Sequence, residues 1–473
     1  MGGELRDKVA SGVAWSIAEK VGSMLLQMGV SIVILRLLTP EQMGIMAIPV
    51  VFSSLALVMV DSGFSQTLIR KAVPSEEDYK SVFVFNIAVS VLLYLLLVGA
   101  MPWIARFYGM PELVRIAPVL FLLVPLNALC VIQNTIFTRQ FRFARLSKVV
   151  FTSSLVSGLV AIGMAWAGCG IWSLVGQRVV AMGVRAMLLW GLSDWRPRAA
   201  FDAGRLRAMA PYSLISSVYN NVSQLFVGKL YAADVLGFFN QAQKLKELPV
   251  TSTMQAVQSV TFPALSKIAD DERKFAESYR QVVMIVAFVM LPMMAGLIVV
   301  APEMVDSLLG EKWMPMVPYF QVISLAGMFA PIATVSNNVL KVKSNGRIIV
   351  RLEVVKKVVM TLVLILTIPH SVLAVTWGLS AMAFFEMILN FGATTRYAGL
   401  TAGRFLRTLL PIASATAAMF GVVWAFGHFT SFAPLPTFLL KVAVGVVCYA
   451  GFGALFRLEA MRVAWELVKK LFR

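Results

Sequence analysis

Five basic residues stand inside apolar stretches that are each long enough to cross a bilayer: Lys20, Arg178, Arg185, Lys244 and Lys246. A charge at the centre of a membrane helix costs about 2.5–3.5 kcal/mol on biological insertion scales, so each one needs a partner or a water-filled cavity. Two or three cations in such a cavity would attract an anion such as a pyrophosphate, because electrostatic attraction is stronger outside bulk water. We therefore predict an anion-binding site, with Arg185, Lys244 and Lys246 lying deepest.

Amide side chains occupy the same apolar stretches and could form a polar wall for the hydroxyl groups of a sugar. They are Gln27, Asn86, Asn220, Asn221, Gln224, Asn240, Gln241 and Gln243. Hydrogen bonds between packed helices are the alternative explanation for some of them, because polar side chains also join helices inside a membrane.

Two acidic residues are candidates for binding a coupling ion. Glu386 lies near the middle of a predicted helix, where it would bind a proton or a sodium ion, or would pair with Arg185 or Lys244. Asp61 lies near a helix end, where a helix cap or a loop anchor is the alternative role. For the deep cations, the purely structural alternative is an ion pair with Glu247 or Glu386 that locks helices together.

The sequence contains few residues that could form a catalytic or metal-binding site. The three cysteines, Cys130, Cys169 and Cys448, show no CxxC spacing, and the two histidines, His370 and His428, stand far apart. A zinc site or a histidine-based triad needs such residues in combination. We therefore expect no catalytic residues, no metal site and no cofactor.

The elements that carry these residues must be membrane helices. Hydrophobic residues make up 59% of the 473 residues, charged residues only 14%, and the mean hydropathy is +0.80. Soluble domains contain roughly 45–50% apolar and about 25% charged residues. Because a spanning helix needs about 20 apolar residues, we predict an all-α membrane protein with about fourteen transmembrane helices.

Charge distribution predicts the orientation of these helices. The net charge is +18, and on the predicted topology 31 Lys and Arg residues fall in loops on the N-terminal side against five on the other. That count places Lys356 and Lys357 in a loop, and Lys441, one turn from a helix end, is expected to snorkel. The positive-inside rule puts both termini in the cytoplasm and explains the basic excess without nucleic acid.

An internal repeat predicts how the helices are grouped. Residues 36–44 read RLLTPEQMG and residues 229–237 read KLYAADVLG, so that basic, Leu, acidic and Gly positions coincide at an offset of 193. We expect two six-helix bundles of the same orientation, residues 1–200 and 201–400, related by a pseudo-two-fold axis along the membrane normal. Residues 401–456 would add two helices, and residues 457–473 a basic amphipathic helix on the membrane surface or a disordered tail.

Four motifs resemble those of a known family. They are RLLTPEQMG, DSGFSQTLIRK (61–71), GIWSLVGQ (170–177) and LGFFNQAQKLKELP (236–249). Together they resemble Wzx-type polysaccharide transporters of the multidrug/oligosaccharidyl-lipid/polysaccharide exporter superfamily, over at least residues 11–265.

This resemblance implies a flippase for an undecaprenyl-pyrophosphate-linked oligosaccharide, such as an O-antigen, capsule or exopolysaccharide repeat unit. It implies the bacterial inner membrane, alternating access with ion coupling as an option, membrane lipids as surroundings, and polysaccharide polymerase or export machinery as further partners. The residues alone support a polar, anionic cargo. An organic-cation or drug antiporter of the same superfamily is the alternative, although deep basic residues outnumber acidic ones. A polysaccharide polymerase or ligase fits poorly because no long outer loop is predicted.

Overall fold

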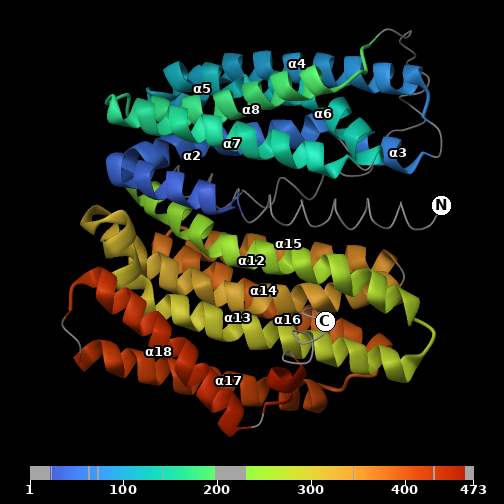
Figure 1. Ribbon diagram of the computed structural model, residues 1–473, viewed down its shortest axis with the longest axis vertical. Helices are drawn as coiled ribbons and strands as arrows, with labels where there is room; N and C mark the ends of the chain where they lie inside the picture. The colour runs from blue at the N-terminus through green and yellow to red at the C-terminus, as the bar shows by residue number, and fades with distance from the viewer. Residues whose placement is uncertain are drawn as a thin grey trace. The chain divides into compact units, whose positions relative to one another are not determined.

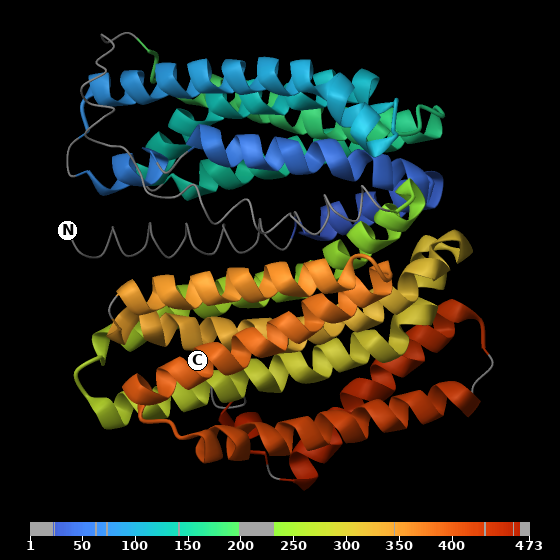
Figure 2. The same ribbon diagram turned by 180° about the vertical axis from the view of Figure 1, so that it is seen from behind.

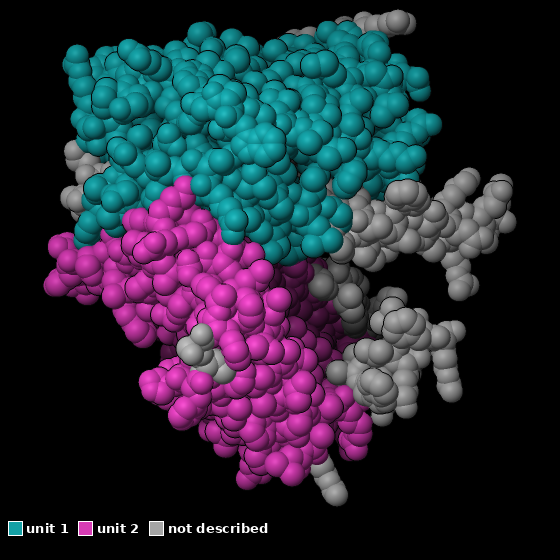
Figure 3. Space-filling model, turned by 60° about the vertical axis from the view of Figure 1, so that its left-hand side comes forward, with its two compact units in different colours: residues 1–237 teal, residues 238–473 magenta. Residues whose placement is uncertain are grey.

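The computed structural model describes residues 22, 24–61, 64–71, 74–140, 142–197, 231–344, 346–429, 432–456 and 458–463. Within these ranges the regular structure is entirely helical, so the predicted all-α class is confirmed. Nine of the described helical segments are long and apolar enough to cross a membrane. The chain divides into two compact units, residues 1–237 and residues 238–473 (Figure 3).

Unit 1 is a bundle of long apolar helices with short connections (Figure 1). Its helices are α2 (Pro40–Asp61), α3 (Phe64–Arg70), α4 (Glu76–Tyr108), α5 (Leu113–Phe121), α6 (Leu123–Arg139), α7 (Phe143–Trp166) and α8 (Trp172–Leu192), and a shorter apolar helix covers Met24–Leu37. Helix α6 packs against α4 and α8, and α8 packs against α7. The apolar run at residues 113–137 consists of two consecutive helices, α5 and α6, with the break at Leu122.

Local hydrogen bonds explain why the helices of unit 1 begin and end where they do. At the start of α2, Gln42 N–H donates to Thr39 Oγ1 (3.3 Å), and Thr39 N–H donates to Gln42 Oε1 (3.1 Å). This reciprocal pair satisfies two backbone donors that a helix start leaves without partners. At the end of α3, the Arg139 guanidinium donates to the carbonyl oxygens of Leu68 (2.6 Å) and Lys71 (2.7 Å).

Unit 2 contains most of α12 (Ala233–Lys267) and the helices that follow it. They are α13 (Glu272–Leu309), a short 3₁₀ helix (Glu311–Met316), α14 (Val317–Lys343), α15 (Gly346–Thr367), α16 (Val372–Ala398), α17 (Ala402–Phe429) and α18 (Pro434–Leu455). Helix α14 packs between α13 and α16, and α17 and α18 both pack against α13 (Figure 2). A buried hydroxyl network joins this core: Tyr279 Oη lies 2.8 Å from Ser336 Oγ and 3.3 Å from Thr394 Oγ1.

One expectation about individual residues is wrong. Lys356 and Lys357 lie in the middle of α15 and not in a loop, because α15 already begins at Gly346. Lys356 is about ten residues, or 15 Å, from that end. The predicted tail helix is described only over residues 458–463, where Leu458 and Ala460 are buried; the rest of it lies outside the described residues.

Candidate functional site

Two arginines mark the middle of α8. Arg178 and Arg185 are seven residues apart, so they lie on the same face of the helix, about 10 Å from each other along its axis. Each lies within about 6 Å of the midpoint of this 21-residue helix. Both side chains are half-buried. Both arginines therefore lie near the middle of α8.

The neighbours of Arg185 hold its backbone firmly against α6. Trp190 Nε1–H donates to the carbonyl oxygen of Leu129 (3.0 Å), and Leu189 is fully buried in a cluster with Cys130. The guanidinium itself is less well held: Nη2 lies 3.4 Å from Asn134 Oδ1, and Nε is buried without a hydrogen-bond partner. Packing fixes the helix, whereas the charged end has donors to spare.

No described carboxylate forms an ion pair with Arg178 or Arg185. A guanidinium keeps its charge at any accessible pH, so it cannot escape the cost of burial by losing a proton. When the helix lies in a membrane these donors need a polar partner, and water or an anionic ligand can supply it. Glu386, which sequence reasoning offered as a partner for Arg185, forms an ion pair with Lys356 within unit 2.

Glu386 forms an ion pair with Lys356, a residue that sequence reasoning placed in a loop. Lys356 Nζ lies 2.8 Å from Glu353 Oε1 and 3.2 Å from Glu386 Oε1. The Lys356 side chain is only 5% exposed, while those of Glu353 and Glu386 are 46% and 37% exposed. The pair therefore joins α15 to α16 with one cation between two carboxylates.

Buried amides accompany the arginines in unit 1. Asn86 on α4 and Gln133 on α6 are fully buried, and neither polar atom of either amide has a hydrogen-bond partner among the described residues. An unsatisfied buried polar group costs about 1–3 kcal/mol, so such groups are retained for a reason other than packing. Gln133 and Asn134 were missed by sequence reasoning, although two adjacent amides in an apolar helix are a readable signal.

The predicted polar residues of α12 lie in unit 2, whereas the arginines belong to unit 1. Asn240 and Gln241 are buried, at 6% and 7% exposure, and both belong to the third turn of the helix. Lys244 is exposed and Lys246 is half-buried. The neighbouring Glu247 interacts electrostatically with Lys246, but the two do not form a close ion pair.

Other predicted site residues are partly or wholly beyond the described ranges. Gln27 lies in the helix Met24–Leu37 and is exposed. Asp61 is the last residue of α2, and its side chain is not described. The remaining four, Lys20, Asn220, Asn221 and Gln224, lie outside the described residues.

The expectation that Lys441 snorkels is wrong. Its side chain is 7% exposed, and Nζ lies 2.6 Å from Glu303 Oε1 on α13. Snorkelling was inferred from distance to the helix end alone, and a carboxylate 138 positions away in the chain could not be foreseen. The second oxygen of this carboxylate, Glu303 Oε2, is buried without a described partner.

Two of the repeat-related motif positions meet at a close helix crossing. A Cβ atom added to Gly44 on α2 would overlap the carbonyl group of Ala233, and one added to Gly237 on α12 would overlap the carbonyl group of Pro40. Both pairs are related by the offset of 193 residues. The repeat therefore places glycine where two helix starts touch backbone to backbone.

Comparison with known proteins agrees with these features. Residues 33–318 match the family described as polysaccharide biosynthesis protein. The teichuronic acid biosynthesis protein TuaB of Bacillus subtilis (strain 168) is 25% identical over 412 residues, which cover 83% of this chain and 84% of TuaB. The succinoglycan biosynthesis transport protein ExoT of Rhizobium meliloti (strain 1021) is 24% identical over 335 residues, covering 69% and 68%.

The fold also has a solved counterpart. The lipid II flippase MurJ, in an inward closed conformation, superposes with a TM-score of 0.73 at 13% identity, over 94% of this chain and 98% of MurJ. At this identity the likeness shows the fold alone. The family match extends over more than half of the chain and includes all four motifs in full, so this chain belongs to the polysaccharide biosynthesis protein family.

Proposed function

We propose that this protein is a flippase that moves an undecaprenyl-pyrophosphate-linked oligosaccharide from the cytoplasmic to the periplasmic leaflet of a bacterial inner membrane. It is a multi-pass membrane protein of a polysaccharide biosynthesis family, with apolar helices in place of soluble domains among its described residues. A relative is named as a succinoglycan transport protein, and a protein of the same fold is a lipid II flippase. No covalent bond is made or broken in this activity.

The observation that carries the proposal is the pair of arginines on α8. A lipid-linked pyrophosphate brings about two negative charges into the membrane, and these must be compensated when water is removed. Arg178 and Arg185 supply two permanent cations on one helix face, without a described carboxylate to neutralise them. Bidentate guanidinium–phosphate hydrogen bonds suit this cargo better than an organic cation, which would need an acidic site.

Other predicted residues take supporting roles in this proposal. Lys244, Lys246 and Lys20 would add positive charge along the path of the pyrophosphate. The amides of Asn240 and Gln241, with Gln27, Asn86 and the residues 220, 221 and 224, would offer hydrogen bonds to sugar hydroxyl groups. The isoprenoid tail would stay in the bilayer while the headgroup crosses by alternating access.

Transport by arginine variants tests this function. In proteoliposomes with leaflet-resolved detection of a lipid-linked oligosaccharide, we expect R178Q/R185Q to lose at least about 100-fold in rate, because two charge-assisted contacts of about 1.5–3 kcal/mol each are removed. R178K/R185K should keep part of the activity. R106Q/R115Q removes the same charge from two exposed positions of unit 1 and should transport normally. Normal transport by R178Q/R185Q would contradict the proposed site.

Glu386 is the coupling residue in this proposal. The carboxylates of Glu386 and Glu353 both pair with Lys356. Protonation of Glu386, or binding of a sodium ion to its carboxylate, would leave the Lys356 ammonium with Glu353 as its partner and would loosen α15 from α16. E386Q should make transport insensitive to an imposed proton or sodium gradient, whereas E353Q should stay sensitive. Equal gradient dependence in both variants would remove Glu386 from this role. Asp61 is the second candidate and is tested by D61N in the same assay.

The orientation and partners belong to the same proposal. Both termini would face the cytoplasm, and a polysaccharide polymerase or export complex would receive the cargo on the other side. A fluorescent protein fused after Arg473 should fold and emit in the cytoplasm, and a periplasmic reporter at the same position should stay inactive. The opposite pattern would reverse the topology.

A further inference from the structure

Unit 2 contains an apolar groove at a distance in the sequence from the arginine site of α8. Its volume is about 1250 Å³, and helices α13, α17 and α18 form its walls together with residues 458–462. The walls lack a side chain at three positions along the groove, which are Gly296, Gly445 and Gly453. From Lys441 to Ala454 the groove follows fourteen residues of α18, over a rise of about 20 Å.

A basic pocket adjoins one end of the groove. It has a volume of about 300 Å³, and its charged lining consists of Arg280, Arg404, Arg407 and Glu459. Leu458 and Glu459 line both the pocket and the groove, so the two spaces are neighbours. Lys441, at the other end of the groove, is neutralised by Glu303 and does not add a free cation there.

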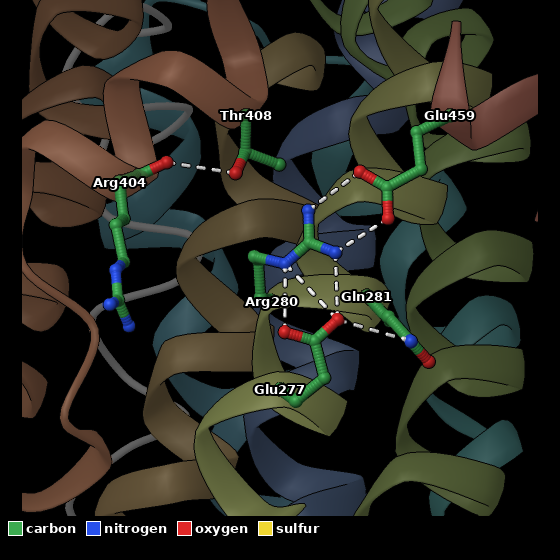
Figure 4. A network of polar contacts seen from close by, with 6 residues as sticks. All are labelled: Glu277, Arg280, Gln281, Arg404, Thr408 and Glu459. Carbon is green, nitrogen blue, oxygen red and sulfur yellow. Dashed lines mark hydrogen bonds and ion pairs between the residues drawn. The ribbon is translucent and has the colours of Figure 1, made fainter. Parts of the chain in front are cut away.

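Within the pocket, Arg280 is already occupied. Figure 4 shows its guanidinium between two carboxylates: Nη2 lies 2.7 Å from Glu277 Oε1 and 2.6 Å from Glu459 Oε1. These bonds hold residues 458–462 against α13 and keep the pKa of Glu459 below its usual range. Arg280 therefore acts as a clamp that shapes the pocket.

The other two arginines remain available to a ligand. Arg404 and Arg407 are one helical turn apart on α17, exposed, and in no ion pair with a described residue. In Figure 4 the Arg404 guanidinium lies apart from both carboxylates of the clamp. The turn that carries them is anchored by Phe405, whose ring stacks on Phe391 with centroids 3.9 Å apart. Two cations are thus fixed beside an apolar groove.

We propose that the pocket and the groove together bind an anionic glycerophospholipid of the surrounding membrane. Its phosphate would lie between Arg404 and Arg407, and one acyl chain would lie along α13, α17 and α18. Basic pockets between membrane helices recognise anionic headgroups in this way. The lipid is a bound component separate from the transported cargo, so this inference does not depend on the proposed function.

Length and charge both fit this occupant. A groove of about 20 Å exceeds the half-thickness of the hydrocarbon core, which is about 15 Å, so one acyl chain from a single leaflet can lie along it in full. Burial of its methylene groups against the apolar lining would stabilise the complex. The two unpaired guanidinium groups then select an anionic headgroup over a zwitterionic one.

Lipid titration of the delipidated, full-length protein tests this site. Palmitoyl-oleoyl phosphatidylglycerol should bind at least about tenfold more tightly than phosphatidylcholine with the same chains, measured by native mass spectrometry. R404Q/R407Q should weaken phosphatidylglycerol binding about 30-fold, whereas R347Q/R351Q, which removes the same charge from exposed positions of α15, should change it by less than about twofold. Equal binding of the two lipids, or of the two double variants, overturns the proposal.

Three further results separate the occupants. G296L fills the groove at a position with no atoms within 4 Å of an added Cβ, so it should weaken phosphatidylglycerol binding while the fold is kept. G392L places the same side chain on the exposed surface of α16 and should have no effect. Two outcomes would contradict a phospholipid site. One is that inorganic phosphate stabilises the protein as strongly as the lipid does. The other is that undecaprenyl phosphate at equal concentration displaces the lipid.

Discussion

Replacing Lys441 with methionine should strongly destabilise the protein, because it leaves Glu303 charged and buried. Lys441 Nζ lies 2.6 Å from Glu303 Oε1, and the two side chains are only 7% and 21% exposed. Breaking a buried ion pair by removing one partner costs about 3–5 kcal/mol. Since Glu303 Oε2 is buried and already lacks a described partner, we expect a loss at the upper end of that range.

Removal of both charges should restore most of the stability. K441M/E303M leaves no uncompensated charge, and such apolar replacements of a buried pair are often neutral or stabilising. Gly427 provides an independent variant: a Cβ atom added there would overlap the Lys441 ammonium, so G427A should displace the ammonium and cost about 1–3 kcal/mol.

Thermal unfolding in detergent, followed by tryptophan fluorescence, measures this series. The expected order of unfolding temperature places the native protein and K441M/E303M highest, G427A in the middle and K441M lowest. R106M removes an exposed cation and serves as the control that should behave like the native protein. If K441M and K441M/E303M unfold at the same reduced temperature, the ion pair is not the source of the effect and the reasoning fails.

The remaining predictions concern backbone contacts in unit 1. G237A should lower the unfolding temperature by an amount that corresponds to about 1–3 kcal/mol, because the added methyl group overlaps the Pro40 carbonyl; G183A, where no atoms lie within 4 Å, should have little effect from crowding. R139M should increase hydrogen exchange at the end of α3, since three carbonyl oxygens lose a charged donor worth about 1.5–3 kcal/mol in all. Unchanged exchange there would show that packing alone ends the helix.

Hydropathy indicates where several individual helices lie. The apolar runs at residues 171–192 and 372–394 of the sequence nearly coincide with α8 and α16, because about 20 apolar residues in a row form a helix when they cross a membrane. The TPEQ sequence at the start of α2 forms a reciprocal cap between Thr39 and Gln42. Helix positions and caps depend on residues that are close together in the sequence, so they can be inferred from the sequence.

Pairing between distant residues could not be predicted. Lys356 was assigned to a loop because charge usually marks the end of a membrane helix, yet Glu386, thirty positions later, makes its position in α15 tolerable. Lys441 is a similar case, with Glu303 on another helix. Charge counting identifies which residues need a partner, whereas tertiary packing decides which partner they find.

For the arginines of α8, the sequence indicates some properties and the structure is needed for others. Their depth followed from counting residues along the helix, and their position on one face followed from the spacing of seven. Only the structure shows that neither arginine has a described carboxylate partner and that Arg185 contacts Asn134. The proposed site therefore combines positions read from the sequence with a chemical state read from the fold.

Binding of undecaprenyl pyrophosphate is the most direct test of the central claim that Arg178 and Arg185 receive an anionic cargo. The native protein should bind this lipid much more tightly than undecaprenol, which has the same tail without phosphate, and R178Q/R185Q should bind the two lipids about equally. An undiminished preference for the pyrophosphate in R178Q/R185Q would contradict the account.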